Sequence, residues 1–320
     1  MSTPETVGVD LGGTKILVGV IGEDRRVLYE DQERSAGQGQ DQLLETLERE
    51  VREALEARPN VAAVGLGIPC TIDRKRGVAI SAVNLPIHNV PIRDLMRERL
   101  GIPVFIDNDA NVAALAEHRF GAAKGTSDAV MLTIGTGIGG GVIIDGEVYR
   151  GATGAASEPG HMVIDFDGPP CQGNCPNHGC LETFASGTAL AREGRVAAER
   201  EPESALGRVL AEGGTIDGKA VTDAANVGDP TALAVVAEAA RRLGAGLSGL
   251  ANIFEPDVIV LGGGVTKAVG ELMIGPARDE LRSRALPPMN EVPVELAELG
   301  TEAGMVGAAE MARLELEQGG

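Results

Sequence analysis

The sequence predicts an α/β fold made of two similar halves, and two observations lead to this prediction. Residues 7–21 and residues 129–145 share one pattern, in which an apolar run ends at a glycine turn and a second apolar run follows. A repeat of this kind is typical of a chain built from two related units. Stretches with helical apolar spacing lie between such runs, as expected for an α/β protein.

The first half combines strand and helix patterns. Apolar runs bounded by turn residues predict buried strands at 7–11, 16–21, 61–67 and 103–107. Apolar spacing predicts helices at about 41–57, at 92–100 and at 108–120. Leu43, Leu47 and Val51 lie on one face of the first of these helices. Asn108 and Asp109 mark the start of the last one, because their side chains can cap free backbone N–H groups.

The second half repeats this order. Strands are expected at 129–134, 141–145 and 258–261. Helices are expected over most of 182–254, directly after Gly264, and at about 303–317. Residues 142–149 predict a hairpin that follows the second glycine turn.

Composition narrows the range of functions. At 320 residues the chain is long enough for two domains. It contains no Trp and only 2% aromatic residues, so the core must consist of Val, Ile, Leu and Ala. The formal net charge of −19 argues against nucleic-acid binding, because binding of phosphates needs Lys and Arg.

The sequence also predicts a cytoplasmic protein. The first residues lack the basic flank and the apolar segment of a signal peptide. No apolar run has the length that a membrane-spanning helix requires. The four cysteines do not resemble a disulfide framework, since three of them lie within ten residues.

The clustered cysteines predict a zinc site. Cys171, Cys175 and Cys180 follow His161, and thiolate and imidazole groups are preferred zinc ligands. His178 is a competing candidate for the position of Cys171. Glu158 and Glu182 bracket the cluster, and carboxylates fixed in this way are suited to binding hydroxyl-rich ligands.

The glycine turns predict phosphate binding through backbone amides. Residues 135–140 match the Gly-x-Gly-x-x-Gly dinucleotide fingerprint, but a hairpin is expected after them instead of the required helix. A nicotinamide dehydrogenase is therefore not expected. Turns that expose backbone N–H groups can bind phosphates, with Asp10 holding Mg²⁺. The alternative is that the glycines only form tight hairpins.

Four polar side chains occur within residues 107–111, where a strand is expected to end and a helix to begin. Capping of the helix would need only one of them. A carboxylate at this place could instead act as a general base toward a substrate hydroxyl. Both interpretations stay open from the residues alone.

Together these motifs resemble the ROK family of sugar kinases and sugar-responsive repressors, and most of all its bacterial glucokinases. The resemblance spans almost the whole chain. Its carriers are residues 10–15, 108–111, 135–140, 158–161, 179–182 and 261–264.

The resemblance implies an actin-like ATPase (ribonuclease H-like) fold with two similar α/β domains around a cleft. The small domain is expected to comprise residues 1–118 and 303–320. The large domain, with the zinc loop, is expected to comprise residues 119–302. Relatives are often dimers or tetramers, so a homo-oligomer is expected.

The resemblance also implies roles for individual residues, with ATP, Mg²⁺ and structural Zn²⁺ as cofactors. Asp109 matches the catalytic base. Sugar contacts are expected from Asn84, Asn108, Asp109, Glu158, His161 and Glu182. Nucleotide contacts are expected from Asp10, Gly12, Gly13, Thr14, Lys15, Thr136, Gly137, Gly262, Gly263 and Gly264. The zinc ligands are expected to be His161, Cys171, Cys175 and Cys180.

Three positions depart from the family pattern. Cys171 lies two residues before the usual first ligand position, which Gly173 occupies. Cys70 stands where glycine is common, and we interpret it as a buried structural thiol. Ser157 replaces a common glycine before Glu158.

The predicted activity is ATP-dependent phosphorylation of glucose at its 6-hydroxyl group, a step of carbohydrate metabolism. Kinases for N-acetylmannosamine, fructose, mannose or allose share these motifs, and polyphosphate remains open as a donor. A sugar-sensing regulator and an actin-like chaperone or filament are the rival hypotheses. No DNA-binding domain is expected before the first strand, and a chaperone would not need the zinc loop.

Overall fold

The computed structural model describes residues 4–22, 25–82 and 85–319, and these residues form two compact units. The first unit comprises Met1–Gly125, Gly141–Ser157 and Thr301–Gly320. The second comprises Thr126–Gly140 and Glu158–Gly300. Among the helices of the described chain, none combines the length and the apolar character needed to cross a membrane.

The first unit contains a five-stranded sheet with the order β3-β2-β1-β4-β8. Its strands are β1 (Thr6–Leu11), β2 (Lys15–Ile21), β3 (Val27–Arg34), β4 (Ala63–Ile68) and β8 (Val104–Asn108). Strand β2 is antiparallel to both of its neighbours, β3 and β1, whereas β1, β4 and β8 run parallel to one another. The carboxyl ends of β1, β4 and β8 therefore meet at one edge of the sheet.

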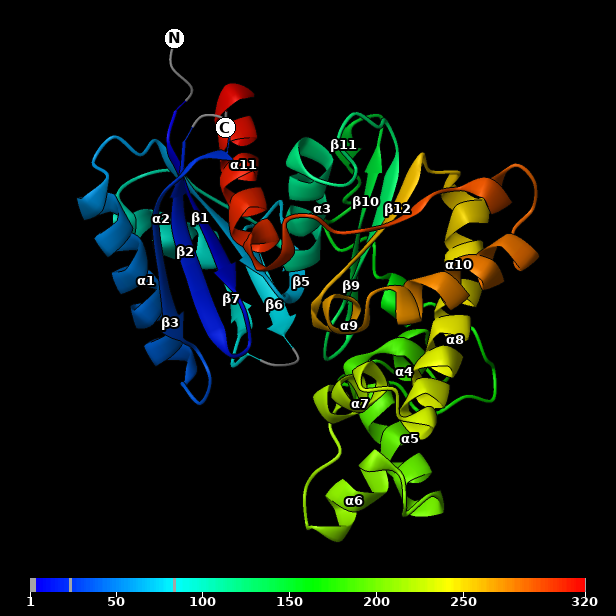
Figure 1. Ribbon diagram of the computed structural model, residues 1–320. Helices are drawn as coiled ribbons and strands as arrows, with labels where there is room; N and C mark the ends of the chain where they lie inside the picture. The colour runs from blue at the N-terminus through cyan, green and yellow to red at the C-terminus, as the bar shows by residue number, and fades with distance from the viewer. Residues whose placement is uncertain (1–3, 23–24, 83–84, 320) are drawn as a thin grey trace. The chain divides into compact units, whose positions relative to one another are not determined.

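Helices cover both faces of this sheet (Figure 1). They are α1 (Gln40–Ala57), α2 (Ile92–Leu100), α3 (Asp109–Phe120) and α11 (Ala303–Glu317). Helix α11 lies very close to the strands, because a Cβ atom on Gly8 or Gly65 would come within 1.9 Å of a backbone oxygen of this helix. Glycine at these two strand positions is what permits the contact.

A small sheet follows β4 in the first unit. Its strands are β5 (Cys70–Asp73), β6 (Val78–Ala82) and β7 (His88–Val90), in the order β5-β6-β7. These strands have few buried apolar residues, so the sequence pattern did not predict them.

The second five-stranded sheet has the order β11-β10-β9-β12-β13. Its strands are β9 (Ala129–Ile134), β10 (Ile138–Ile144), β11 (Glu147–Val148), β12 (Val258–Gly262) and β13 (Val294–Leu296). Counted along the chain, both sheets have the strand order 3-2-1-4-5. The duplication inferred from the glycine turns is therefore confirmed at the level of topology.

Helices make up most of the rest of the second unit. They are α4 (Glu182–Ala185), α5 (Gly187–Arg200), α6 (Ala205–Ala211), α7 (Gly218–Asn226), α8 (Pro230–Phe254), α9 (Gly264–Val269) and α10 (Glu271–Arg284). Short 3₁₀ turns are η2 (Pro159–His161), η3 (Met289–Glu291) and η4 (Gly300–Glu302), the last of which crosses into the first unit. Asp229 caps α8 by accepting from the backbone N–H of Ala232, and Pro230 occupies the first helical position.

The sequence predicted most of these elements, and the α/β class is confirmed. Helices at 92–100 and 303–317 have the expected bounds. Strand β10 begins at Ile138, three residues before the expected start, and β3, β13 and α10 were not predicted.

The two compact units differ from the expected domains, which divided the chain into 1–118 with 303–320 and 119–302. Residues 119–125 and 141–157 group with the first unit. Close packing explains the second of these segments. A Cβ atom on Gly141 would lie 2.5 Å from Ala114 Cβ and 2.9 Å from the backbone oxygen of Ala110, both in α3.

Candidate active-site residues

The carboxyl edge of the first sheet carries two of the predicted site segments. In the parallel register, Asp10 on β1 pairs with Gly67 on β4, and Gly67 pairs with Asp107 on β8. Asp10 on β1 and the turn that follows Asp107 on β8 therefore lie at the same edge of the sheet, and only β4 separates the two strands. Ligand sites of α/β sheets commonly occur at such carboxyl edges.

In the turn that leads into α3, one of the polar side chains, Asn108, caps the helix. Asn108 is the N-cap of α3, and its Oδ1 accepts from the backbone N–H groups of Ala110 at 2.9 Å and Asn111 at 3.3 Å. This single side chain satisfies two of the free backbone N–H groups at the start of the helix. The carboxylate of Asp109 is therefore not needed as the N-cap, which favours the chemical interpretation over capping alone.

The two carboxylates at this edge have perturbed acidities. Burial raises the pKa of Asp10 to about 7, with the charge of Asp109 adding to the rise and Lys15 opposing it. Burial also raises the pKa of Asp109, although two backbone N–H groups oppose this effect. A Cβ atom on Gly304 would lie 2.6 Å from Asp10 Oδ2, so the first turn of α11 packs directly against this carboxylate.

Cys70 lies close to the same turn. Its side chain is buried, and its backbone oxygen accepts from Asn108 Nδ2 at 3.4 Å. Burial, followed by the charge of Asp109, raises the pKa of the Cys70 thiol to about 12. The thiol is thus a small apolar group with little thiolate character, as the sequence suggested.

The first glycine turn joins β1 to β2. The backbone N–H of Gly12 donates to the Lys15 oxygen at 2.9 Å, and Ser35 Oγ donates to the Gly12 oxygen at 2.7 Å. The backbone N–H of Ser35 also donates to the Thr14 oxygen, at 3.1 Å. Ser35 thus fixes the turn that holds Gly12, Gly13 and Thr14. Asn84, a predicted sugar contact, lies outside the described residues.

In the second unit, two glycine segments lie at the carboxyl ends of neighbouring parallel strands. Strand β9 leads to residues 135–137 and β12 leads to residues 262–264, and Gly262 pairs with Thr133 in the register. Strand β10 follows the first segment directly, so the helix that a dinucleotide fingerprint requires is not formed there. Helix α9 begins at Gly264.

Glycine is required in these segments for different reasons. Gly263 has φ of 94°, and a Cβ atom there would lie 2.4 Å from the Ile134 backbone oxygen. On Gly137 a Cβ atom would lie 2.2 Å from Glu182 Oε2. This carboxylate oxygen accepts from the backbone N–H of Ile138 at 2.7 Å. Glu182 is buried and so ties the glycine turn to α4.

Four side chains of the second unit converge on one point. The ligand atoms of His161, Cys171, Cys175 and Cys180 all lie within 4.8 Å of one another. His161 Nδ1 is 3.4 Å from Cys171 Sγ, and the sulfurs of Cys175 and Cys180 are 3.9 Å apart. Exposed His178 is not part of this group.

The separations fit a tetrahedral zinc site. Bonds of about 2.0–2.3 Å from zinc to nitrogen and sulfur imply N···S and S···S edges of about 3.6 and 3.8 Å. The two measured edges, 3.4 and 3.9 Å, lie close to these values. Burial and the neighbouring thiols raise the pKa of Cys171, a penalty that a bound divalent cation would reverse.

The other predicted sugar contacts lie beside this cluster. His161 ends the short 3₁₀ turn η2, and its backbone N–H donates to the Glu158 oxygen at 3.1 Å. Its Nδ1 faces the sulfurs, which leaves Nε2 as the nitrogen for a second partner. Cys180 precedes Glu182 by two residues, so the cluster and the predicted hydroxyl-binding carboxylates share one short segment.

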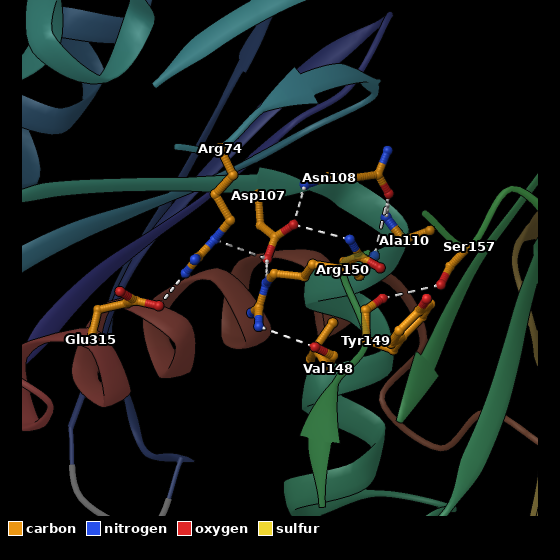
Figure 2. A network of polar contacts seen from close by, with 10 residues as sticks. Arg74, Asp107, Asn108, Ala110, Val148, Tyr149, Arg150, Ser157 and Glu315 are labelled. Atoms are coloured by element: carbon orange, nitrogen blue, oxygen red, sulfur yellow. Dashed lines mark hydrogen bonds and ion pairs between the residues drawn. The ribbon is translucent and has the colours of Figure 1, made fainter. Parts of the chain in front are cut away.

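The structure adds a group of residues that the sequence analysis did not single out. Arg150, from the segment after β11, and Arg74, from the turn after β5, both point to the buried carboxylate of Asp107 (Figure 2). Arg150 is 43 positions from Asp107, and no short-range pattern connects them. The only available signal was the excess of polar residues at 107–111.

Comparisons with known proteins identify one family. The profile described as "ROK family" matches residues 6–315. The glucokinase of Streptomyces coelicolor is 37% identical over 314 residues, which cover 96% of this chain and 97% of that protein. The xylose repressor of Caldicellulosiruptor bescii is 31% identical over 316 residues, which cover 95% of this chain and 77% of the repressor.

The solved structures include a ROK family glucokinase from Streptomyces griseus in complex with glucose and AMPPNP. Its chain is 38% identical to this one, and the TM-score is 0.85. The superposition covers 97% of this chain and 99% of that chain. The likeness therefore extends over both compact units.

Proposed function

The chain belongs to the ROK family, and from this premise we propose that it is a glucokinase that transfers the γ-phosphate of ATP to the 6-hydroxyl group of glucose. The expected actin-like ATPase fold is confirmed by the likeness to solved ROK kinases. The proposal concerns the substrate, the donor and the roles of individual residues.

The observation that carries the proposal is the position of Asp109. This carboxylate begins α3 at the carboxyl edge of a parallel sheet, and the neighbouring Asn108 already performs the capping. Burial raises the pKa of Asp109, so its ionised form is a stronger proton acceptor than an ordinary carboxylate. A general base with these properties suits the activation of a sugar hydroxyl.

In the proposed mechanism, Asp109 accepts the proton of the 6-hydroxyl group while that oxygen attacks the γ-phosphorus in line. Asn108 Nδ2 is directed to the Cys70 oxygen only at 3.4 Å, a long bond that a sugar hydroxyl could replace. Correct orientation of the attacking oxygen supplies several kcal/mol, up to about 7–11 in the best cases.

The glycine segments are proposed to bind the nucleotide. Backbone N–H groups of residues 12–14 and 135–137 would bind phosphate oxygens, and residues 262–264 would lie near the adenosine. Asp10 offers the oxygen ligand that Mg²⁺ prefers, and the paired carboxylates at this edge favour a cation. Magnesium, when bound, offsets charge on the transferred phosphate.

The cysteine cluster is proposed to bind structural zinc. Four protein ligands leave no open position, so the ion would hold the loop and take no part in the reaction. Glu158, His161 Nε2 and Glu182 Oε1 are then the groups proposed to bind other hydroxyls of the sugar. Glu182 would act with one oxygen only, because Ile138 already occupies the other.

A coupled assay tests the proposal. Purified protein with Mg²⁺ and ATP should release ADP only when glucose is present. The same assay with mannose, fructose, allose and N-acetylmannosamine, and with polyphosphate in place of ATP, identifies the preferred pair. Failure to phosphorylate any of these sugars with either donor would refute the proposed function.

A sugar-sensing regulator is the second candidate, because the xylose repressor aligns with 95% of this chain. Such a protein would bind a sugar without releasing ADP. Calorimetry with glucose, run beside the coupled assay, separates the two functions. We also propose a homo-oligomer, which light scattering of the purified protein would test.

A further inference from the structure

Asp107 is a buried carboxylate two residues before the proposed base. Its side chain is 1% exposed, yet both of its oxygens accept hydrogen bonds. Oδ1 accepts from the backbone N–H of Asn108 at 2.9 Å and from Asn111 Nδ2 at 3.0 Å. Oδ2 accepts from Arg150 Nε at 2.5 Å. One carboxylate thus joins the end of β8, the first turn of α3 and the segment after β11 (Figure 2).

Neighbouring charged side chains compensate the charge of the buried Asp107 carboxylate. Arg74 Nε lies 3.8 Å from Asp107 Oδ2, an ion-pair distance that is too long for a hydrogen bond. Arg74 also pairs with Glu315 of α11. The formal charges of Asp107, Arg150, Arg74 and Glu315 sum to zero, so the buried Asp107 carboxylate has its charge compensated within this group.

Asp107 is unsuited to act on a substrate itself. It is closed off from solvent, and Arg150 engages the oxygen that Asn108 and Asn111 leave available. Asp109, two residues further on, is half-buried as a residue, whereas Asp107 is buried. The two carboxylates of this turn therefore differ in their partners: side chains of Asn111 and Arg150 engage both oxygens of Asp107, whereas backbone N–H groups of its own turn act on Asp109.

We propose that Asp107, fixed by Arg150, is a positioning residue that sets the conformation of the turn carrying the general base Asp109. Asn108 is held on its N–H by Asp107, and Asn111 is held on its side chain by the same oxygen. Asp109 lies between these two anchors, so its backbone can shift only if they release. The catalytic part of this inference rests on the proposed function.

The first experiment replaces Asp107 with its nearest neutral analogue. Asp107→Asn retains an oxygen for Asn108 and Asn111 but removes the charge that Arg150 requires. We expect kcat for glucose phosphorylation to fall about 10–100-fold with the KM values for glucose and ATP within about threefold. Hydrogen exchange of the Ala110 and Asn111 amides should accelerate at least about tenfold.

The matched control is Glu310→Gln. Glu310 is a buried carboxylate of the same unit, 6% exposed, and its ion-pair partners, Arg313 and Arg119, both lie outside the turn. We expect it to lower the melting temperature while kcat stays within about twofold and exchange at Ala110 stays unchanged. An equal loss of kcat in both variants would reduce Asp107 to a purely structural role and overturn the inference.

Substitutions of Arg150 form a second experiment, which remains informative if the Asp107→Asn variant does not fold. Arg150→Met should lower kcat as Asp107→Asn does, and Arg150→Lys should restore part of it by keeping the charge. The double variant Asp107→Asn with Arg150→Met should lose no more than about the larger single loss. Additive losses would mean that the two residues act separately, which contradicts the proposal.

The exchange measurement also separates this inference from the proposed function. Wild-type protein without kinase activity would refute the function, but accelerated exchange in Asp107→Asn would still show that Asp107 holds the turn. Unchanged exchange at Ala110 and Asn111 would refute the positioning role whatever the activity.

Discussion

The carboxyl edges of the two five-stranded sheets have one topology but opposite chemistry. The first edge presents carboxylates, with Asp10 after β1 and the Asp107–Asp109 turn after β8. The second edge presents glycine backbone after β9 and β12, and a thiol and imidazole cluster follows in the chain. The strand order fixes where a site can form, whereas the few residues after each strand determine its chemistry.

The largest effect is expected from replacing the proposed base, Asp109, at the first edge. Asp109→Asn keeps the shape of the turn and its capping by Asn108 but removes the proton acceptor. We expect kcat to fall about 10²–10⁴-fold, the range typical of a lost general base, with glucose and nucleotide binding largely kept. Steady-state kinetics and calorimetry with glucose measure the two quantities.

Asp41→Asn is the control for Asp109→Asn. Asp41 is also an aspartate in the first turn of a helix of this unit, α1, and it should leave kcat within about twofold. Turnover at the wild-type rate in Asp109→Asn would remove Asp109 from the role of base.

The next effect concerns the second edge. Cys180→Ser should reduce bound zinc from about one ion per chain to nearly none, because the fully buried Cys180 sulfur is one of four ligands. Since the same segment carries Glu182, glucose affinity should weaken about 10–100-fold. Metal analysis and calorimetry check these outcomes.

Cys70→Ala is the matched variant in the first unit, since Cys70 is also buried but lies outside the cluster. It should keep its zinc. Zinc content that is low already in the wild-type protein, or equal in the two cysteine variants, would contradict the assignment of the four ligands.

A smaller expected effect concerns how the stability contributed by Asp10, at the first edge, depends on pH. Because the pKa of Asp10 is raised from 3.8 to about 7 on folding, its protonated form favours the folded state. That contribution is complete below about pH 4 and is lost as the pH rises to about 7. Asp10→Asn should therefore become progressively more stable than the wild type over this window, in thermal unfolding without added Mg²⁺.

Asp94→Asn serves as the control for Asp10, because Arg93 lowers the pKa of the exposed Asp94 carboxylate. Its wild-type contribution is present above the ordinary aspartate pKa and lost as the pH falls. The stability difference should thus have the opposite sign. A constant difference between Asp10→Asn and wild type from pH 4 to pH 7 would mean that Asp10 is not perturbed.

Sequence patterns predicted the parts of the fold that local interactions decide. Helix α2 ends at Gly101, which adopts a left-handed φ of 74°, and its predicted bounds are correct. Strand β3 was missed because its residues are mostly exposed and show no alternation. Pairing with β2, a contact of the folded chain, holds that strand in place.

The residues of the candidate site likewise fall into two groups, those that sequence spacing could reveal and those that only the folded structure reveals. Asn108, Asp109 and the cysteines are close in sequence and could be found from spacing. The partner of Asp107 could not, because Arg150 reaches it only through the packing of residues 141–157 on α3. Likewise, the bond from Ile138 to Glu182 joins residues 44 positions apart. Sequence thus revealed the reactive groups, and only the structure revealed what holds them.

The smallest predicted effect lies where the chain passes from the first unit to the second. Ser157 has φ of 68°, a left-handed conformation that costs a non-glycine residue about 1 kcal/mol. Its Oγ donates to the Tyr149 oxygen at 3.2 Å, which offsets part of this cost (Figure 2). Ser157→Ala should lower stability by about 0.5–1 kcal/mol, because it loses the bond and keeps the strain.

Ser157→Gly loses the same bond but relieves the strain, so it should be about 0.5–1 kcal/mol more stable than Ser157→Ala in urea unfolding. The two variants share the lost hydroxyl group, and their difference therefore isolates the backbone. Equal stability of the two would mean that the strain at residue 157 is absorbed elsewhere. Because Glu158 follows directly, relief of the strain should also leave glucose affinity within about twofold if the zinc cluster, rather than Ser157, fixes that carboxylate.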